Sequence, residues 1–297
     1  MSATPGTAVA TRKTHTGPRR PRPRRDVLDK PLKVIFPIWI VVTVLIVLFP
    51  LYLIFLVSFA PGIALFGERP DLFTSEPTLQ WWRSVVEGGD LIPPLIKSLV
   101  VATVTTLVAI VIAAPAAYVI SRLRPAVRYT IVIGLLVTRM FPEFAIGISV
   151  ATRFAKLGFI DDYTGVILAH LIGALPFIAW ILVGTFETIP RELEEASAID
   201  GASRLGTLIR VVMPLALPGI AVAALFVWLY SWNEFVFARL LTTTQNTLPL
   251  QVFQAIDRGS KQQMATVAAV LTLPILFVVY FLQRYLRPGA LTGAVKG

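Results

Sequence analysis

The sequence predicts an all-α membrane protein with six transmembrane helices and a helix–turn–helix on the cytoplasmic side. The first observation is composition: of 297 residues, 56% are hydrophobic and only 15% are charged, and the mean hydropathy is +0.74. An average soluble domain is about 45–50% apolar and about 25% charged, so a soluble core could not bury this much apolar surface. The second is that the apolar residues are grouped in long segments with few or no charged residues. The third is the absence of cysteine, which excludes a disulfide scaffold and thiolate metal sites.

Six segments are each long enough to cross the hydrocarbon core of a bilayer, which takes about 20 mostly apolar residues. They cover residues 34–60, 98–120, 129–151, 163–186, 211–238 and 262–283. We therefore expect one six-span permease domain over residues 34–286, with a loop at 187–214 between the fourth and fifth spans.

The basic residues predict the orientation of the spans. Most of the 27 Lys and Arg residues precede the first span or fall in loops on the same side of the membrane as that tail. By the positive-inside rule, both termini are cytoplasmic and the chain is a multi-pass protein of the cell membrane. Residues 1–33 form a basic tail expected to be disordered and to touch anionic lipid weakly, and residues 287–297 form a second cytoplasmic tail. The first tail lacks the aromatic residues that would suggest nucleic-acid binding.

The long connection between the first two spans, residues 61–97, requires structure of its own or a partner. The pair Trp81–Trp82 predicts a short helix lying at the membrane interface, where amphipathic rings are stable. The alternative is a docking surface for an external protein.

The loop at 187–214 carries the signals of two short helices. Pro190 suits a first helical turn, and the glutamates that follow it favour the positive end of a helix dipole. Gly201 is placed to end the first helix, and Ser203 to cap the second. Its small residues fit close packing into the groove of a partner, whereas a solvated acidic connector is the simpler alternative.

At this loop the chain resembles the permease subunits of ABC importers. Their EAA pattern is similar to Glu195-Ala196-Ser197, three residues, Gly201, nine residues, Val211, one residue and Met213-Pro214. Every spacing agrees, while Ser197, Val211 and Met213 depart conservatively from the pattern. Asp200, the run 231–235 and the tail 288–297 resemble the sugar-importer branch, in particular the smaller permease of maltose/trehalose-type transporters.

The resemblance implies a set of partners and a mechanism. The partners are a second permease, two cytoplasmic ATPases and an extracytoplasmic sugar-binding protein, with membrane lipid around the spans. ATP and Mg²⁺ belong to the ATPases, and this chain binds no cofactor or metal and is not an enzyme. Its tail glycines lack the P-loop spacing. Alternating access would move a disaccharide such as trehalose or maltose. The residues implied in ATPase coupling are Glu194, Glu195, Ala196, Ser197, Ile199, Asp200, Gly201, Ala202 and Ser203.

Ionisable residues inside spans are costly, so each is a candidate for function. Arg139 and Glu143 are predicted one helical turn apart near the midplane of the third span, where Pro142 loosens the helix. They are candidates for the substrate path, and a mutual ion pair is the alternative. His170 in the fourth span is either a hydrogen-bonded interior histidine or a proton relay.

The end of the fifth span combines aromatic and polar side chains, as sugar sites do. Trp228, Trp232, Asn233 and Glu234 are therefore further candidates for the substrate path, and an interfacial aromatic belt is the alternative. Glu234 could instead pair with Arg139 or Arg239. The intramembrane charges also leave a second function open, an ion-coupled secondary transporter, which would give no reason for the EAA-like loop.

Overall fold

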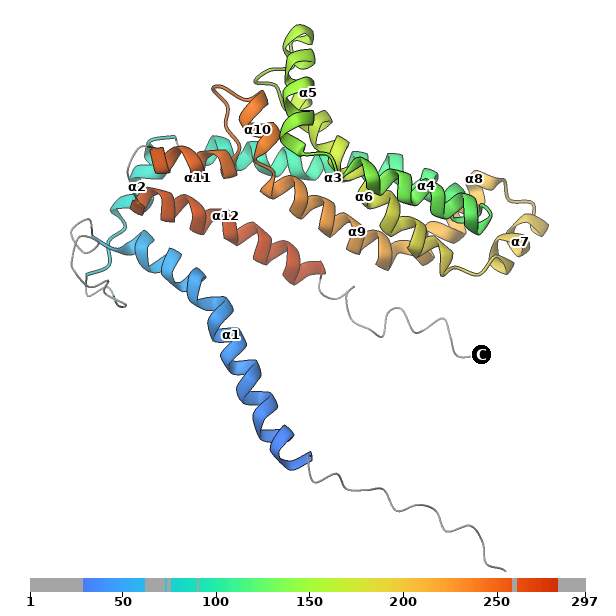
Figure 1. Ribbon diagram of the computed structural model, residues 1–297, viewed down its shortest axis with the longest axis horizontal. Helices are drawn as coiled ribbons and strands as arrows, with labels where there is room; N and C mark the ends of the chain where they lie inside the picture. The colour runs from blue at the N-terminus through green and yellow to red at the C-terminus, as the bar shows by residue number, and fades with distance from the viewer. Residues whose placement is uncertain (1–28, 62–72, 74–75, 90, 258–260, 283–297) are drawn as a thin grey trace, which may run out of the picture. The chain divides into compact units, whose positions relative to one another are not determined.

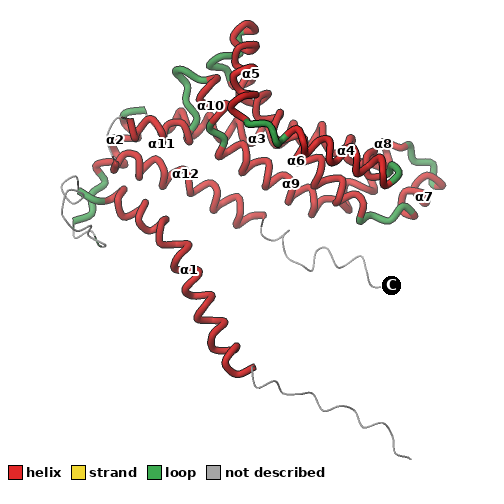
Figure 2. Tube along the Cα trace, viewed as in Figure 1, coloured by secondary structure: helices red, strands yellow, loops and turns green. Residues whose placement is uncertain are grey.

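The computed structural model describes residues 29–61, 73, 76–89, 91–257 and 261–282. All of these residues lie in helices or in the loops that join them, without a strand among them (Figure 2). In chain order the helices are α1 (Asp29–Phe59), α2 (Gln80–Glu87), α3 (Ile92–Ser121), α4 (Pro125–Thr138), α5 (Glu143–Leu157), α6 (Tyr163–Glu187), α7 (Glu192–Ile199), α8 (Arg204–Thr207), the π-helical turn η2 (Leu208–Val212), α9 (Met213–Asn233), α10 (Val236–Leu241), α11 (Leu248–Asp257) and α12 (Lys261–Leu282) (Figure 1). The all-α class is confirmed. The predicted tails, apart from residues 29–33, lie outside the described residues.

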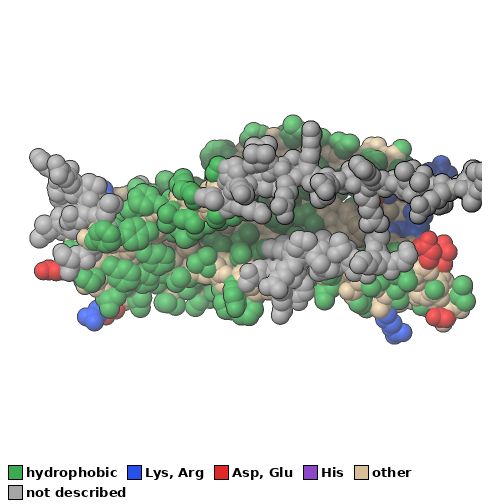
Figure 3. Space-filling view, turned by 90° about the horizontal axis from the view of Figure 1, so that it is seen from below, with side chains coloured by type: hydrophobic (Ala, Val, Ile, Leu, Met, Phe, Trp, Pro, Cys, Tyr) green, Lys and Arg blue, Asp and Glu red, His purple; other side chains and the backbone are tan. Residues whose placement is uncertain are grey.

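Five of the described helical segments are long and apolar enough to cross a membrane. They are Ile35–Phe59, Ile92–Ser121, Tyr163–Glu187, Arg204–Asn233 and Lys261–Phe281. Helices α4 and α5 make a sixth when they are counted together. On the face drawn in Figure 3, hydrophobic side chains cover most of the coloured surface, as expected of helices surrounded by lipid.

The third predicted span, residues 129–151, is wrong as a single helix. Helix α4 ends at Thr138, α5 begins at Glu143, and the two are bent by 78° at the break. Pro142 is the cause, because it has no N–H to continue the hydrogen bonding of α4 and it forces Phe141 away from helical geometry. Arg139 and Glu143 therefore lie on either side of a break and not one turn apart on one helix.

Two further span boundaries also differ from the prediction. The second span begins at Ile92 and not at residue 98, so that Lys97 lies inside α3 with only 1% of its surface exposed. Its Nζ donates a 2.6 Å hydrogen bond to the carbonyl of Gln245, which lets the helix continue through a charged residue. The fifth span ends at Asn233, because Glu234 has extended backbone geometry, and α10 follows separately.

The chain divides into two compact units, residues 1–49 and residues 50–297. In the second unit α3, α6 and α9 pack on one another and hold the largest buried apolar cluster (Figure 1). Small side chains on their facing surfaces let the helices approach closely, as in other membrane bundles. The alanines of this cluster are Ala109, Ala113, Ala114, Ala117, Ala174, Ala179, Ala216 and Ala223.

The expected short helix at the Trp pair is α2. The indole of Trp81 donates a 3.0 Å hydrogen bond to the carbonyl of Ala60, and the ring of Trp82 stacks on Phe59 at 5.5 Å between centroids. These contacts hold α2 against the residues that end α1. Its position at a membrane interface stays a prediction.

A carboxylate joins the loop before α6 to the loop after α10. Asp161, which has a positive φ of 60°, accepts hydrogen bonds from the backbone N–H groups of Thr243 and Thr244 and from both of their hydroxyls. Burial alone would raise the pKa of Asp161, but these donors outweigh it and hold that pKa well below its usual value.

This carboxylate makes stability depend on pH in one direction. Because the pKa of Asp161 is lower in the folded chain, its contribution is present above the unfolded pKa of about 4 and is lost as the pH falls further. We expect Asp161→Asn to lower the midpoint of thermal unfolding in detergent at pH 7, with a smaller difference from the unchanged chain below pH of about 3. A difference that stays constant across this range would contradict the assigned role.

Candidate functional site

The helix–turn–helix predicted after the fourth long apolar segment is present as α7, α8 and η2. Gly201 has a φ of +83°, and the N–H groups of Gly201 and Ala202 donate to the carbonyls of Ala198 and Ser197, which closes the end of α7. Ser203 caps α8 by accepting from the N–H of Gly206 at 3.1 Å. Pro190 lies outside the first turn, since Arg191 is the N-cap of α7.

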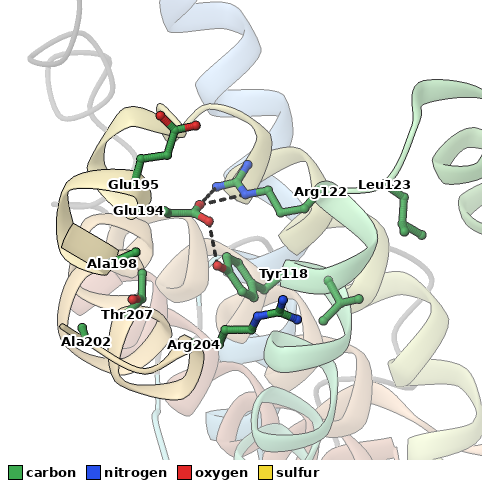
Figure 4. A pocket seen from close by; sticks show the side chains of 10 residues that line it. Tyr118, Arg122, Leu123, Glu194, Glu195, Ala198, Ala202, Arg204 and Thr207 are labelled. Atoms are coloured by element: carbon green, nitrogen blue, oxygen red, sulfur yellow. Dashed lines mark hydrogen bonds and ion pairs between the residues drawn. The ribbon is translucent and has the colours of Figure 1, made fainter. Parts of the chain in front are cut away.

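One face of α7 is turned inward and bound to the rest of the bundle. Ser197 is buried and its hydroxyl lies 3.0 Å from that of Thr207. The carboxylate of Glu194 accepts a 2.7 Å hydrogen bond from the phenol of Tyr118 and a 2.8 Å hydrogen bond from Nε of Arg122, with which it also forms an ion pair (Figure 4). Two of the nine residues expected to contact an ATPase are therefore turned towards their own chain.

The opposite face of α7 is open. Ile199 is 87% exposed and Leu193 42% exposed, although both are large apolar side chains, and Glu195, Ala196 and Asp200 are exposed beside them. In Figure 4 the dashed lines from Arg122 and Tyr118 end on the carboxylate of Glu194, and the carboxylate of Glu195 lies apart from them. An exposed apolar residue on a polar loop is typical of a surface that a partner covers.

A polar cluster lies at the break between α4 and α5. The guanidinium of Arg139 lies 3.8 Å from the carboxylate of Glu143, so the ion pair that the sequence left as an alternative is present. The phenol of Tyr230 on α9 donates to the same carboxylate at 3.3 Å, and the guanidinium lies 5.1 Å from the centroid of the Tyr230 ring. Both charged side chains stay partly exposed, 28% and 42%, which leaves room for a polar ligand.

A cavity of about 320 Å³ opens beside this cluster. Its lining combines the charged pair with apolar and aromatic side chains, among them Phe141, Ile172 and Phe237. Gly173 on α6 also lines it and fixes the position of Tyr230, because a Cβ atom built there would lie 2.1 Å from the phenol oxygen. Because Gly173 has no side chain, the phenol of Tyr230 can approach α6 closely and reach the carboxylate of Glu143.

Gly173→Ala is expected to push Tyr230 away from Glu143 and to destabilise the bundle by about 1–3 kcal/mol through overpacking. The measurement is the midpoint of thermal unfolding in detergent. Gly184→Ala on the same helix is the control, since nothing lies within 4 Å of its Cβ position. Adding Tyr230→Phe removes the closest atom and should restore part of the loss. Equal midpoints for the two alanine variants would contradict this packing.

The tryptophans of α9 need a correction, because neither presents a free ring face. Trp228 and Trp232 stack on each other at 4.9 Å and are buried in a cluster with residues of α2, α3, α11 and α12. The indole of Trp232 donates to the carbonyl of Leu271 at 3.2 Å. Both are core residues in this structure and not an aromatic belt. Asn233 is exposed, and its amide donates back to the carbonyl of Leu229.

Glu234 is buried, with 5% of its surface exposed, and pairs with neither Arg139 nor Arg239 among the described contacts. Its carboxylate accepts hydrogen bonds from the N–H groups of Phe237 and Ala238 in the first turn of α10, and it lies 2.9 Å from Nε2 of His170. His170 is equally buried, and its Nδ1 lies 2.7 Å from the hydroxyl of Ser231. The interpretation of His170 as a hydrogen-bonded interior residue agrees with this arrangement.

Four residues of these two sites are not among the site residues predicted from the sequence: Tyr118, Arg122, Gly173 and Tyr230. Tyr118 and Arg122 are four residues apart at the end of an apolar helix, a spacing that places them on one face. Arg122 is one of the basic residues whose placement predicts the topology, but an arginine at the end of a span can also bind a neighbouring loop. Within the described residues, no group of three or more His, Asp or Glu side chains is placed to hold a metal ion.

Comparison with known proteins agrees with this architecture. Residues 106–291 match the family described as "Binding-protein-dependent transport system inner membrane component". The chain is 34% identical to the trehalose transport system permease protein SugB of Mycobacterium tuberculosis, over 87% of this chain and 97% of that protein. It is 32% identical to the trehalose/maltose transport system permease protein MalG of Thermococcus litoralis, over 92% and 99% respectively.

Among solved structures, one similar chain belongs to a bacterial ABC transporter involved in the import of the acidic polysaccharide alginate. The TM-score is 0.71 at 21% identity, and the match covers 90% of this chain and 100% of the other. At this identity the likeness establishes the fold.

Proposed function

Because this chain belongs to the family of binding-protein-dependent transport system inner membrane components, we propose that it is the permease subunit of an ABC importer for a disaccharide such as trehalose or maltose. One observation carries the proposal: an apolar and acidic face of α7, with Ile199 87% exposed, projects from a bundle of membrane-length helices. The sugar systems named by its relatives support the substrate class.

In this proposal the chain works within an assembly. A second permease completes the path, two cytoplasmic ATPases bind ATP and Mg²⁺, and an extracytoplasmic binding protein delivers the sugar. A structural relative was solved in complex with an alginate pentasaccharide-bound periplasmic protein, which supports the last of these partners. The termini and the α7–α8 loop face the cytoplasm, as the basic residues predict. The outward face of α7, with Glu195, Ala196, Ile199 and Asp200, meets one ATPase.

The polar cluster at the α4–α5 break is the proposed contact with the sugar. Sugar hydroxyls both donate and accept, so the Glu143 carboxylate, the Arg139 guanidinium and the Tyr230 phenol offer complementary partners. The aromatic rings in the cavity lining fit the apolar C–H faces of a pyranose. Partial exposure of the charged pair supports access from the cavity. Alternating access would open this cavity to each side in turn, driven by closure of the ATPases.

The direct test is reconstitution of the chain with its candidate partners in proteoliposomes. We expect uptake of labelled disaccharide that requires ATP, the ATPases and the binding protein, and that persists when proton and sodium gradients are collapsed. Uptake that follows the ion gradient without ATPases would overturn the proposal in favour of an ion-coupled transporter. Failure of the chain to copurify with any ATPase would also count against it.

A further inference from the structure

Glu194 and Glu195 are neighbours on α7, but they differ in exposure and in the partners that bind them. The side chain of Glu194 is 17% exposed and bound within the chain, whereas Glu195 is exposed and lies outside this bonded group (Figure 4). Successive side chains on a helix lie about 100° apart, so the two carboxylates point in different directions although both residues line the cavity drawn in Figure 4. The two glutamates therefore have separate tasks.

The carboxylate of Glu194 is fixed by two different donors, one on each oxygen. Oε2 accepts from the phenol of Tyr118 at 2.7 Å, and Oε1 accepts from Nε of Arg122 at 2.8 Å. Tyr118 lies in the last turn of α3, and Arg122 is its C-cap, so both donors belong to the end of one membrane-length helix. We call Glu194, Tyr118 and Arg122 the Glu194 joint.

Arg122 extends the joint to a second long helix. Its Nη1 donates to the carbonyl of Phe186 at 3.0 Å, in the last turn of α6, and its Nη2 to that of Ile189 at 3.4 Å, just after that helix. In return Arg191, the N-cap of α7, donates to the carbonyl of Arg122 at 3.1 Å. One guanidinium thus connects the ends of α3 and α6 to the first turn of α7.

The Glu194 joint is largely shielded from solvent, which strengthens the interactions that hold it. Arg122 and Glu194 are each 17% exposed, so their charge-assisted hydrogen bonds are less screened than those of a surface ion pair. The planar guanidinium also lies 5.5 Å from the ring of Tyr118, which limits its rotation. A displacement of α7 would therefore displace the ends of α3 and α6 as well.

We propose that Glu194, through Tyr118 and Arg122, is a positioning residue for energy coupling and does not itself contact the ATPase. It fastens the ATPase-binding helix to the two central membrane helices, so that movement of α7 moves the bundle. The proposal rests on the proposed function, because it requires that an ATPase moves α7. Without the joint, the outward face of α7 still meets the ATPase, but its motion is not transmitted.

The test compares Glu194→Ala with the matched neighbour Glu195→Ala in the reconstituted assembly. For Glu194→Ala we expect unchanged copurification with the ATPase, continued ATP hydrolysis and a fall of about fivefold or more in sugar transported per ATP. For Glu195→Ala we expect weaker copurification. A normal transport-to-ATP ratio in Glu194→Ala, or the same loss of copurification in both variants, would overturn the proposal.

A second arm separates uncoupling from misfolding. The chain has no cysteine, so Ile199→Cys supplies a single site for maleimide labelling. In the assembly this site should be protected equally with and without Glu194→Ala, which reports that α7 is folded and docked. Equal protection together with the reduced ratio supports the proposal, and lost protection overturns it.

A double-variant cycle tests whether the residues act together. Tyr118→Phe removes one donor and should lower the transport-to-ATP ratio less than Glu194→Ala does. In the Glu194→Ala background it should change nothing further, because its acceptor is gone. Additive effects would overturn the joint. If the unchanged chain shows no ATP-driven uptake at all, the proposed function fails, and this outcome is seen before any variant is compared.

Discussion

Replacing His170 with leucine is expected to destabilise the helix bundle by about 3 kcal/mol or more. His170 is 1% exposed and lies between the Ser231 hydroxyl at 2.7 Å and the Glu234 carboxylate at 2.9 Å. Leucine would leave both polar groups buried without this partner, and removing one member of a buried polar pair costs far more than the pair contributes. The measurement is the midpoint of thermal unfolding of the purified chain in detergent.

Two further variants make this prediction specific. Asn233 precedes Glu234 in the sequence but is exposed. The free energy of unfolding of Asn233→Ala should therefore stay within about 0.5 kcal/mol of that of the unchanged chain. The double variant His170→Leu with Glu234→Gln should lose less stability than the sum of the losses of the two single variants. The reason is that glutamine removes the carboxylate charge of Glu234 that would otherwise be buried without its histidine partner. Additive losses would show that His170 and Glu234 act independently.

Ile199→Asp is expected to lower copurification with the ATPase and ATP-driven sugar uptake by about tenfold or more. The side chain is 87% exposed, so the change should leave folding of this chain intact. In the proposed assembly it becomes buried in a partner groove, where an unpaired carboxylate costs several kcal/mol, and about 1.4 kcal/mol already changes an affinity tenfold. Pull-down of the ATPase and uptake into proteoliposomes measure the two effects.

Leu157→Asp provides a matched control for this change. Leu157 is also the last residue of its helix, α5, is 65% exposed and is followed by a glycine with positive φ. Copurification with the ATPase should be unaffected, since Leu157 belongs to the opposite end of the proposed topology. An equal loss in both variants would mean that any exposed charge at a helix end disrupts the assembly, and the specific role of Ile199 would be rejected.

Local signals in the sequence predicted the helix–turn–helix well. Gly201 ends α7 because its φ of +83° is readily reached only without a side chain, and Ser203 caps α8 through its own hydroxyl. The same locality explains the error in the third span. Hydropathy over 129–151 is continuous, but Pro142 acts on the backbone and breaks the helix by 78°. A hydropathy average does not register this effect of a proline on the backbone.

The substrate-path candidates separated in a way that no pattern in the sequence could determine. Arg139 and Glu143 line a cavity, whereas Trp228, Trp232 and Glu234 are buried and bonded within the bundle. Aromatic and polar residue types are the same in a sugar site and in a packed core. Which one they form depends on the helices that cover them, here α2, α11 and α12 for the tryptophans.

The sequence by itself determined the membrane class, the number of apolar segments and the family resemblance, because hydropathy, charge placement and turn residues act within a few positions of the chain. Only the tertiary structure decided that Glu194 faces inward while Glu195 faces outward. That difference depends on Tyr118 and Arg122, more than 70 residues away, whose donors reach one carboxylate and not its neighbour. Contacts between distant segments depend on how the helices pack. A composition of 56% hydrophobic residues does not specify that packing, because many arrangements of apolar helices would bury the same residue types.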